Sequence, residues 1–156
     1  MQLQNTNSQI KTLFIDRDGV INEQIIGGYV MEIEQFVFRK DVLEALSLLR
    51  THFGRVLLVT NQQCVGKGLC LMENIERVHA WMQRQLGQHG CAFDKIYCCP
   101  HLASDDCACR KPKPGMAQQA LLDFPDTDIQ NSVMVGDTLS DMQFARNAGL
   151  APVHVG

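Results

Sequence analysis

Three cysteines and one histidine lie close together at a spacing that suits a metal ion. The chain reads Cys-Pro-His, then five residues, then Cys-x-Cys, which offers Cys99, His101, Cys107 and Cys109 as ligands. Thiolate sulfur and imidazole nitrogen are ligands that Zn²⁺ prefers, and four protein ligands complete its tetrahedral shell. We therefore predict a structural zinc ion within residues 99–109, not one that activates water.

Basic residues follow this cluster directly. Arg110, Lys111 and Lys113 lie in the run Arg-Lys-Pro-Lys-Pro-Gly. A lysine acts as a point charge that suits a phosphoryl group, whereas the planar fork of an arginine suits a second anionic group on the same ligand. A solvated basic loop is the alternative interpretation, and the adjacent zinc cluster makes it less attractive.

Carboxylates are placed to complement these cations. Asp16 and Asp18 follow the apolar run 12–15, and Asp137 and Asp141 follow the apolar run 133–136. Several carboxylates at one edge of a sheet repel each other unless a cation lies among them, and hard oxygen ligands suit Mg²⁺. We predict a magnesium site here. A purely structural acidic patch is the alternative.

Such a site is suited to phosphoryl transfer. Asp16 can attack phosphorus as a nucleophile, while Asp18 protonates the leaving oxygen and later deprotonates water. Thr60 would contribute a hydroxyl donor and Lys111 a fixed positive charge. The alternative for Thr60 is a threonine that merely ends a strand or caps a helix.

Short apolar runs alternate with stretches of helical periodicity along the chain. The runs cover residues 12–15, 56–59, 96–98 and 133–136, with a fifth, edge-strand candidate at 152–155. Continuous apolar runs are typical of strands covered on both faces, as in a parallel sheet. We predict an α/β fold: a three-layer α/β/α sandwich with a mainly parallel, Rossmann-like sheet that binds ligands beyond the carboxyl ends of its strands.

Length and composition favour one domain. The chain has 156 residues, 46% of them apolar, and a formal charge of −3, which does not favour a nucleic-acid partner. The polar segment 1–10 lacks the features of a signal peptide, and no apolar run approaches the ~18 residues that a membrane span needs. We expect a domain over 11–156 and a cytoplasmic monomer, with Cys64, Cys70, Cys91 and Cys98 as reduced thiols.

These motifs resemble those of the haloacid-dehalogenase-like (HAD-like) phosphatases. The resemblance is carried by Asp16-x-Asp18-Gly19-Val20, Thr60-Asn61, Arg110-Lys111 and Gly136-Asp137-x3-Asp141, and it covers residues 11–155. It implies a phosphoaspartyl intermediate on Asp16, acid–base catalysis by Asp18, and Mg²⁺ on Asp16, the Asp18 backbone carbonyl and Asp137. It also implies phosphoryl contacts from Thr60 and Lys111, and substrate recognition by Arg110.

Within this family the chain looks like the zinc-loop branch, whose members act on heptose bisphosphate or histidinol phosphate. The resemblance favours the 7-phosphate of a heptose 1,7-bisphosphate, with histidinol phosphate as the alternative substrate. A non-catalytic, zinc-stabilised module that binds a phosphorylated ligand is the alternative of another class. The expected substrate-contacting residues are Ile26, Gly27, Gly28, Tyr29, Thr60, Asn61, Gln62, Gln63, Arg110 and Lys111.

The spacing of the motifs leaves no room for a separate cap domain. The intervals from Asp18 to Thr60 and from Thr60 to Lys111 are each filled once a helix and a strand are placed in them. We therefore expect an open catalytic edge walled by the zinc loop and by residues 23–32. Thr138 and a longer loop at 23–27 depart from the heptose pattern near the expected sugar site.

Overall fold

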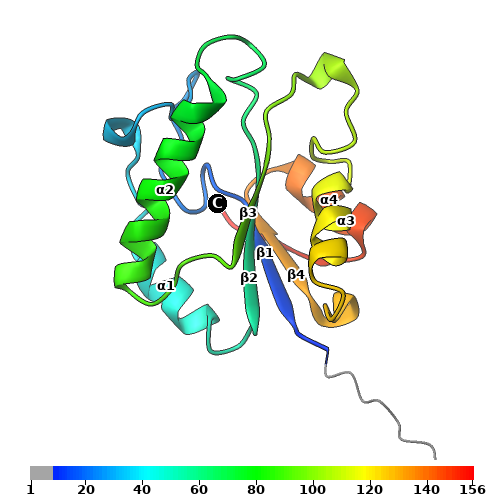
Figure 1. The fold of residues 1–156 in the computed structure, drawn as a ribbon. Coiled ribbons are helices and arrows are strands. Elements are labelled where there is room, and N and C mark those ends of the chain that lie inside the picture. Colours follow the sequence, from blue (N-terminus) through cyan, green and yellow to red (C-terminus); the bar gives the residue numbers. More distant parts are fainter. Residues whose placement is uncertain (1–8) are drawn as a thin grey trace, which may run out of the picture.

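A parallel sheet of five strands forms the centre of the computed structural model, which describes residues 9–156 (Figure 1). The strands are β1 (Thr12–Ile15), β2 (Arg55–Asn61), β3 (Lys95–Cys99), β4 (Val133–Gly136) and β5 (Ala151–His154). They lie in the order β3-β2-β1-β4-β5, and every neighbouring pair is parallel. Each strand overlaps one of the predicted apolar runs, so the predicted parallel α/β fold is confirmed.

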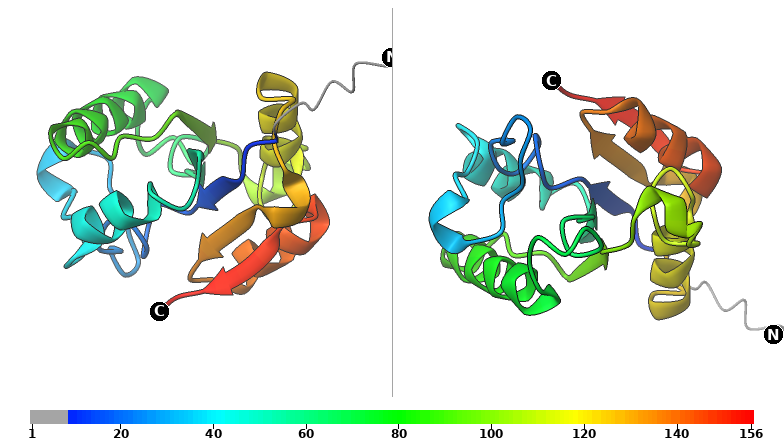
Figure 2. Two further views of the ribbon diagram at one scale, coloured as in Figure 1. Left: turned by 90° about the horizontal axis from the view of Figure 1, so that it is seen from below. Right: turned by 90° about the horizontal axis from the view of Figure 1, so that it is seen from above.

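Helices cover both faces of this sheet, as Figure 2 shows from two ends. The helices α1 (Val42–Leu49) and α2 (Met72–Gln88) lie on one face, and α3 (Gly115–Asp123) and α4 (Leu139–Ala148) lie on the other (Figure 1). Three short 3-10 helices lie in the connections: η1 (Ile33–Gln35), η2 (Ala103–Asp105) and η3 (Ile129–Asn131). The predicted three-layer sandwich is therefore confirmed.

The strands separate two hydrophobic cores. On β1, Leu13 and Ile15 pack into the core with Met82 of α2, whereas Phe14 packs on the other face with Phe144 of α4. Because side chains alternate along a strand, a continuous apolar run can serve both cores at once. This double burial explains why β1 is apolar from Leu13 to Ile15, and it fixes the position of the residues that follow the strand.

The strand order places a topological switch point beside β1. The chain leaves β1 toward β2 and β3, then returns to form β4 on the opposite side of β1. Ligands of open α/β sheets bind at such switch points, beyond the carboxyl ends of the strands. Within residues 9–156, the connections from β1 to β2 and from β2 to β3 contain only η1, α1 and α2, with no separate cap domain.

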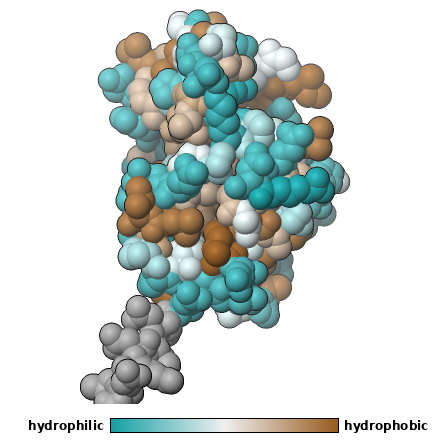
Figure 3. Space-filling model, turned by 90° about the vertical axis from the view of Figure 1, so that its right-hand side faces the viewer, coloured by the Kyte–Doolittle hydropathy of each residue, from teal (hydrophilic) through white to brown (hydrophobic). Residues whose placement is uncertain are grey.

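The predicted N-terminal segment 1–10 lies largely outside the described residues. Its last residue, Ile10, pairs with Thr127 and so belongs to the fold of the domain. No helix within residues 9–156 is long and apolar enough to cross a membrane. On the face covered by α3 and α4, hydrophobic residues lie in small groups separated by hydrophilic ones (Figure 3).

Candidate active site

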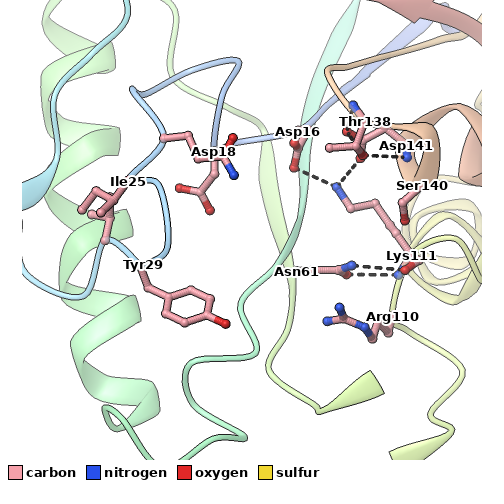
Figure 4. Close-up of a pocket in the computed structure, with 13 residues that line it drawn as sticks. Asp16, Asp18, Ile25, Tyr29, Asn61, Arg110, Lys111, Thr138, Ser140 and Asp141 are labelled. Carbon is pink, nitrogen blue, oxygen red and sulfur yellow. Dashed lines mark hydrogen bonds and ion pairs between the residues drawn. The ribbon is translucent and has the colours of Figure 1, made fainter. Parts of the chain in front are cut away.

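A cavity of about 300 Å³ opens at the carboxyl ends of β1 and β2, beside the first turn of α4 (Figure 4). The segment 24–30 forms one wall, and the loop that follows the Cys/His cluster forms the opposite wall. The lining residues are Asp16, Asp18, Gln24, Ile25, Gly28, Tyr29, Val30, Asn61, Arg110, Lys111, Thr138, Ser140 and Asp141. Acidic and basic side chains from three separate segments thus face one solvent-accessible space.

Lys111 forms the centre of the cavity floor. Its side chain is buried, and its ammonium group donates to Asp16 Oδ1 at 2.8 Å, to Asp141 Oδ1 at 2.7 Å and to the Val59 carbonyl at 2.9 Å. Burial alone would lower the pKa of Lys111, but the charges of Asp16 and Asp141 outweigh it and raise the pKa. The lysine is therefore a fixed cation beside Asp16.

Two asparagine side chains hold the backbone at Lys111 and Pro112. Asn61, at the end of β2, accepts from the Lys111 N–H at 3.0 Å and donates to the Lys111 carbonyl at 3.2 Å. Asn147 of α4 donates to the Pro112 carbonyl at 2.9 Å. The lysine is thus positioned by its backbone as well as by its ammonium group.

A group of three carboxylates lies next to this cation. One oxygen from each of Asp16, Asp137 and Asp141 falls within 4.8 Å of the others. Burial raises the pKa of Asp16 to about 7, with Lys111 opposing the rise and Asp141 adding to it, and burial also raises the pKa of Asp137. Asp137 Oδ1 is buried without a hydrogen-bond partner among residues 9–156. An orphaned carboxylate oxygen in an acidic cluster fits a hard divalent cation such as Mg²⁺.

Asp141 also organises the start of α4. Its Oδ2 accepts from the Thr138 N–H at 3.3 Å, and the Thr138 hydroxyl accepts from the Asp141 N–H at 3.1 Å. This reciprocal pair is a capping box that satisfies free N–H groups at the helix start. Asp141 therefore links the helix cap to the Lys111 ammonium group, and Thr138 has a structural role at this position.

Asp18 is held by a separate set of donors. Asp18 Oδ1 accepts from Arg17 Nη2 at 2.8 Å and from Asn22 Nδ2 at 2.9 Å, and Asp18 Oδ2 accepts from Gln62 Nε2 at 2.9 Å. Burial would raise the pKa of Asp18, but the Arg17 charge and these hydrogen bonds outweigh it and hold the pKa below its usual value. Gln62 Nε2 also donates to the Thr60 hydroxyl at 2.8 Å. The two predicted catalytic groups Asp18 and Thr60 thus share one buried glutamine.

The Cys/His cluster has a geometry that fits zinc. The distances from Cys109 Sγ are 2.7 Å to Cys99 Sγ, 3.2 Å to His101 Nδ1 and 3.7 Å to Cys107 Sγ. Cys99 Sγ lies 3.6 Å from Cys107 Sγ and 3.5 Å from His101 Nδ1. Ligand atoms bound tetrahedrally at about 2.3 Å stand roughly 3.8 Å apart, so this donor set can close around one ion with small adjustments.

The predicted site residues fall into two groups. Seven of the predicted catalytic and substrate-contacting residues line the cavity: Asp16, Asp18, Gly28, Tyr29, Asn61, Arg110 and Lys111. The structure places the others outside the lining: Ile26 is 98% exposed, Gly27 and Gln63 lie nearby, and Thr60 and Gln62 are buried beneath the floor. Gln63 and Lys67 both donate to the Tyr29 hydroxyl, at 3.4 Å and 2.6 Å.

Several contributors to the site have no distinctive sequence signal. Gln24, Ile25, Val30 and Ser140 line the cavity, and Arg17, Asn22 and His79 support Asp18 from behind. Arg17 and Asn22 could have been noted, because Arg17 is the middle residue of the Asp-x-Asp motif and Asn22 follows it by four residues. His79 comes from the middle of α2, where the helical periodicity indicates only a residue that packs in the protein interior. His79 is indeed buried, and it also contacts Arg17.

Comparison with known proteins places the chain in a family. The family described as HAD-hydrolase-like matches residues 108–156. The chain is 42% identical over 139 residues to D-glycero-alpha-D-manno-heptose-1,7-bisphosphate 7-phosphatase of Mycobacterium bovis, covering 89% of this chain and 73% of the relative. It is 41% identical to D-glycero-beta-D-manno-heptose-1,7-bisphosphate 7-phosphatase of Vibrio cholerae, covering 88% and 76%.

A solved structure agrees with these relatives. The D,D-heptose 1,7-bisphosphate phosphatase of B. bronchiseptica, crystallised with magnesium and phosphate, superposes with a TM-score of 0.84 at 36% identity and covers 91% of this chain and 78% of that one. The fold, the floor of charged residues and the similarity over most of the chain lead to one assignment. The chain belongs to the HAD-like hydrolases and, within them, to the family of D-glycero-D-manno-heptose-1,7-bisphosphate 7-phosphatases.

Proposed function

We propose that the chain is a Mg²⁺-dependent phosphatase that removes the 7-phosphate of D-glycero-D-manno-heptose 1,7-bisphosphate through a phosphoaspartyl intermediate. The observation that carries this proposal is the floor of the cavity, where Asp16, Lys111 and Asp141 are joined by hydrogen bonds of 2.7–2.8 Å. The names of the relatives in Mycobacterium bovis and Vibrio cholerae supply the substrate.

The reaction requires two displacements at phosphorus. An Asp16 oxygen attacks the phosphorus atom, the bond to the sugar oxygen breaks, and that oxygen takes a proton from Asp18. Asp18 then takes a proton from a water molecule, which attacks the same phosphorus atom and releases Asp16 and inorganic phosphate. Because the pKa of Asp18 is low in the free site, its first proton must arrive with substrate, and a phosphate monoester with a second pKa of about 6 can carry it.

Charged groups stabilise the phosphoryl group during both steps. Mg²⁺ held by Asp16, the Asp18 backbone carbonyl and Asp137 would supply positive charge against the phosphoryl oxygens. Lys111 adds a second, permanent charge at Asp16, and Thr60 adds a hydroxyl at the end of β2. These fixed charges act without reorganisation as the transition state forms.

Arg110 is suited to the other phosphate of the substrate. It lines the cavity, and its Nη1 is buried without a hydrogen-bond partner among residues 9–156. An unpaired guanidinium N–H favours an incoming anion, and the arginine fork matches phosphate oxygens. We propose that Arg110 binds the phosphate that is not hydrolysed, within a cytoplasmic, monomeric enzyme whose zinc ion is structural.

Phosphate release by the purified protein with Mg²⁺ tests this function. We expect a clear preference for heptose 1,7-bisphosphate over histidinol phosphate, and assays with both the α and β anomers will establish which form is used. Asp16→Asn should abolish turnover, whereas Asp41→Asn, an exposed position away from the cavity, should retain it. Preference for histidinol phosphate would overturn the substrate, and phosphate binding without turnover of either compound would favour a binding module.

A further inference from the structure

Arg17 is a buried cation directly behind Asp18. Its side chain is fully buried, and Nη2 and Nε donate to Asp18 Oδ1 at 2.8 Å and 3.3 Å. The remaining guanidinium nitrogen, Nη1, lies 3.0 Å from Nε2 of His79, and the ring of Phe36 covers the group at 5.9 Å. The orientation of this arginine is therefore decided by only two polar partners among the described residues, Asp18 and His79.

The contact with His79 requires a neutral imidazole. A guanidinium group has donors and no acceptor, so Nε2 of His79 must accept the hydrogen bond and Nδ1 carries the proton. His79 is buried in α2, and burial together with the Arg17 charge lowers its pKa to about 3. The imidazole thus remains an acceptor at neutral pH.

The two oxygens of Asp18 have different surroundings. Asp18 Oδ1 accepts from both Arg17 and Asn22, whereas Oδ2 accepts, among the residues that the structure describes, only from Gln62. The carboxylate lines the cavity. Oδ2 therefore has the freer lone pair for a proton. Proton transfer depends on the direction of that lone pair, so the carboxylate must not rotate.

We propose that His79 is a positioning residue for proton transfer: by fixing the Arg17 guanidinium group, it aligns Asp18 Oδ2 with the leaving oxygen of the substrate. This inference rests on the acid–base role proposed for Asp18. Without the acceptor on His79, Nη1 of Arg17 would be buried and unpaired, and the guanidinium group would turn to regain a hydrogen bond. Asp18 would turn with it.

Two variants of His79 separate this role from packing. Gln and Met have similar length and flexibility, but only Gln offers an oxygen that can accept from Arg17. Both His79→Gln and His79→Met disturb the packing of α2, so the difference between them reports on the acceptor. His52→Met, at an exposed position outside the site, is the matched control for loss of a histidine.

The readout is the ratio of kcat/KM for heptose 1,7-bisphosphate to kcat/KM for p-nitrophenyl phosphate. An alkoxide leaving group needs a proton from Asp18, whereas a nitrophenolate leaves without one. The value of kcat/KM depends only on the steps up to departure of the leaving group. The later hydrolysis of the phosphoaspartyl intermediate therefore does not affect the ratio. Both substrates are assayed on one preparation, so the ratio is independent of the folded fraction.

We expect His79→Met to lower this ratio about tenfold, part of the ~10²–10⁴-fold that positioned acid–base catalysis supplies. His79→Gln and His52→Met should keep the wild-type ratio. An unchanged ratio in His79→Met, or equal losses in the Gln and Met variants, would overturn the positioning role. If wild-type protein hydrolysed neither substrate, the proposed function would fail, and this inference with it.

Discussion

Arg17 and Lys111 are two buried cations, and each is matched to specific oxygen acceptors near the end of β1. Arg17 pairs with Asp18, and Lys111 pairs with Asp16 and Asp141. Removing one partner of such a buried pair costs about 3–5 kcal/mol, because the remaining charge stays uncompensated. Arg17 and Lys111 are thus needed for the stability of the fold as well as for the proposed chemistry.

His79 should make the stability of the protein sensitive to acid. Its pKa falls from 6.5 to about 3 on folding, so between these values the unfolded chain binds a proton that the folded chain does not. The stabilising contribution of neutral His79 is therefore fully present above about pH 6.5 and is lost as the pH falls toward 3. From pH 7 to pH 5 the loss from this group is about 2 kcal/mol.

Urea unfolding at the two pH values measures this contribution. The His79→Gln variant lacks the titrating ring, so its free energy of unfolding should fall less than that of wild type between pH 7 and pH 5. The remaining titratable groups are the same in both proteins, so their contributions cancel when the two pH dependences are subtracted. Parallel pH dependences in the two proteins would show that His79 does not carry this effect.

Gly19 is a residue whose lack of a side chain protects the predicted magnesium site. Its φ of +85° suits glycine, and a Cβ there would overlap with the Asp137 carboxylate. Gly90 has a φ of +68° with open space around it, so Gly90→Ala carries the backbone strain without the clash. Each alanine should cost ~1–2 kcal/mol of stability.

Only Gly19→Ala should weaken magnesium binding, because it displaces Asp137. We expect about a 10- to 100-fold rise in the Mg²⁺ concentration that gives half-maximal activity, as for other changes around metal ligands. Gly90→Ala should keep the wild-type value. Titration of activity with Mg²⁺ checks this, and equal values for both variants would argue against Asp137 as a ligand.

At the scale of elements, the loop with the predicted zinc site supports the basic wall of the cavity. The four Cys/His residues of that site end at Cys109, and Arg110 and Lys111 follow immediately. The loop is tied back to the domain where the Gly115 N–H donates to the Ala108 carbonyl at 3.0 Å. The segment 100–114 contains no α-helix or strand, and only the 3-10 helix η2, so its shape depends on the Cys/His cluster and on single hydrogen bonds such as those from Asn61 and Asn147.

Zinc removal should therefore disorder this loop and reduce activity. After chelation and restoration of Mg²⁺, we expect about a 100-fold loss of kcat/KM, because Arg110 loses its position and Lys111 keeps only the support of its own hydrogen bonds. Limited proteolysis should cut within residues 102–114 in the zinc-free protein and not in the zinc-loaded one. Added Zn²⁺ should restore both properties, whereas full activity of zinc-free protein would contradict a positioning role.

The sequence predicts elements better than it predicts the contacts between them. The five strands could be predicted because each contains a local apolar run, which is buried in β1 and β2 and exposed in the edge strand β5. The chemistry-bearing residues at Asp16, Thr60 and Asp137 lie at the ends of three of these runs. The support of Asp18 by His79 through Arg17 could not be predicted from the sequence, because it depends on how α2 packs against a turn 62 residues earlier. Likewise, Gln62 was expected at the substrate, but the direction of its side chain depends on the packing around β2.

At the scale of the whole molecule, magnesium binding should stabilise the folded state. The unfolded chain cannot gather Asp16 and Asp137, so a cation that binds them shifts the folding equilibrium toward the native protein. At a Mg²⁺ concentration 100 times the dissociation constant, the gain is about 2.7 kcal/mol. Thermal unfolding with and without Mg²⁺ should show a higher Tm for wild type and Asp41→Asn, and a much smaller shift for Asp137→Asn.

The position of β4 beside β1 also has a consequence for protein synthesis. A growing chain acquires Asp16 early, but Asp137 and Asp141 emerge only after nearly all of the sheet has been made. Until then Lys111 has only part of its final set of acceptors, and the carboxylates cannot gather around a cation. We therefore expect a nascent chain that has not reached α4 to lack phosphatase activity, so that ribosome-bound fragments would not consume phosphorylated metabolites.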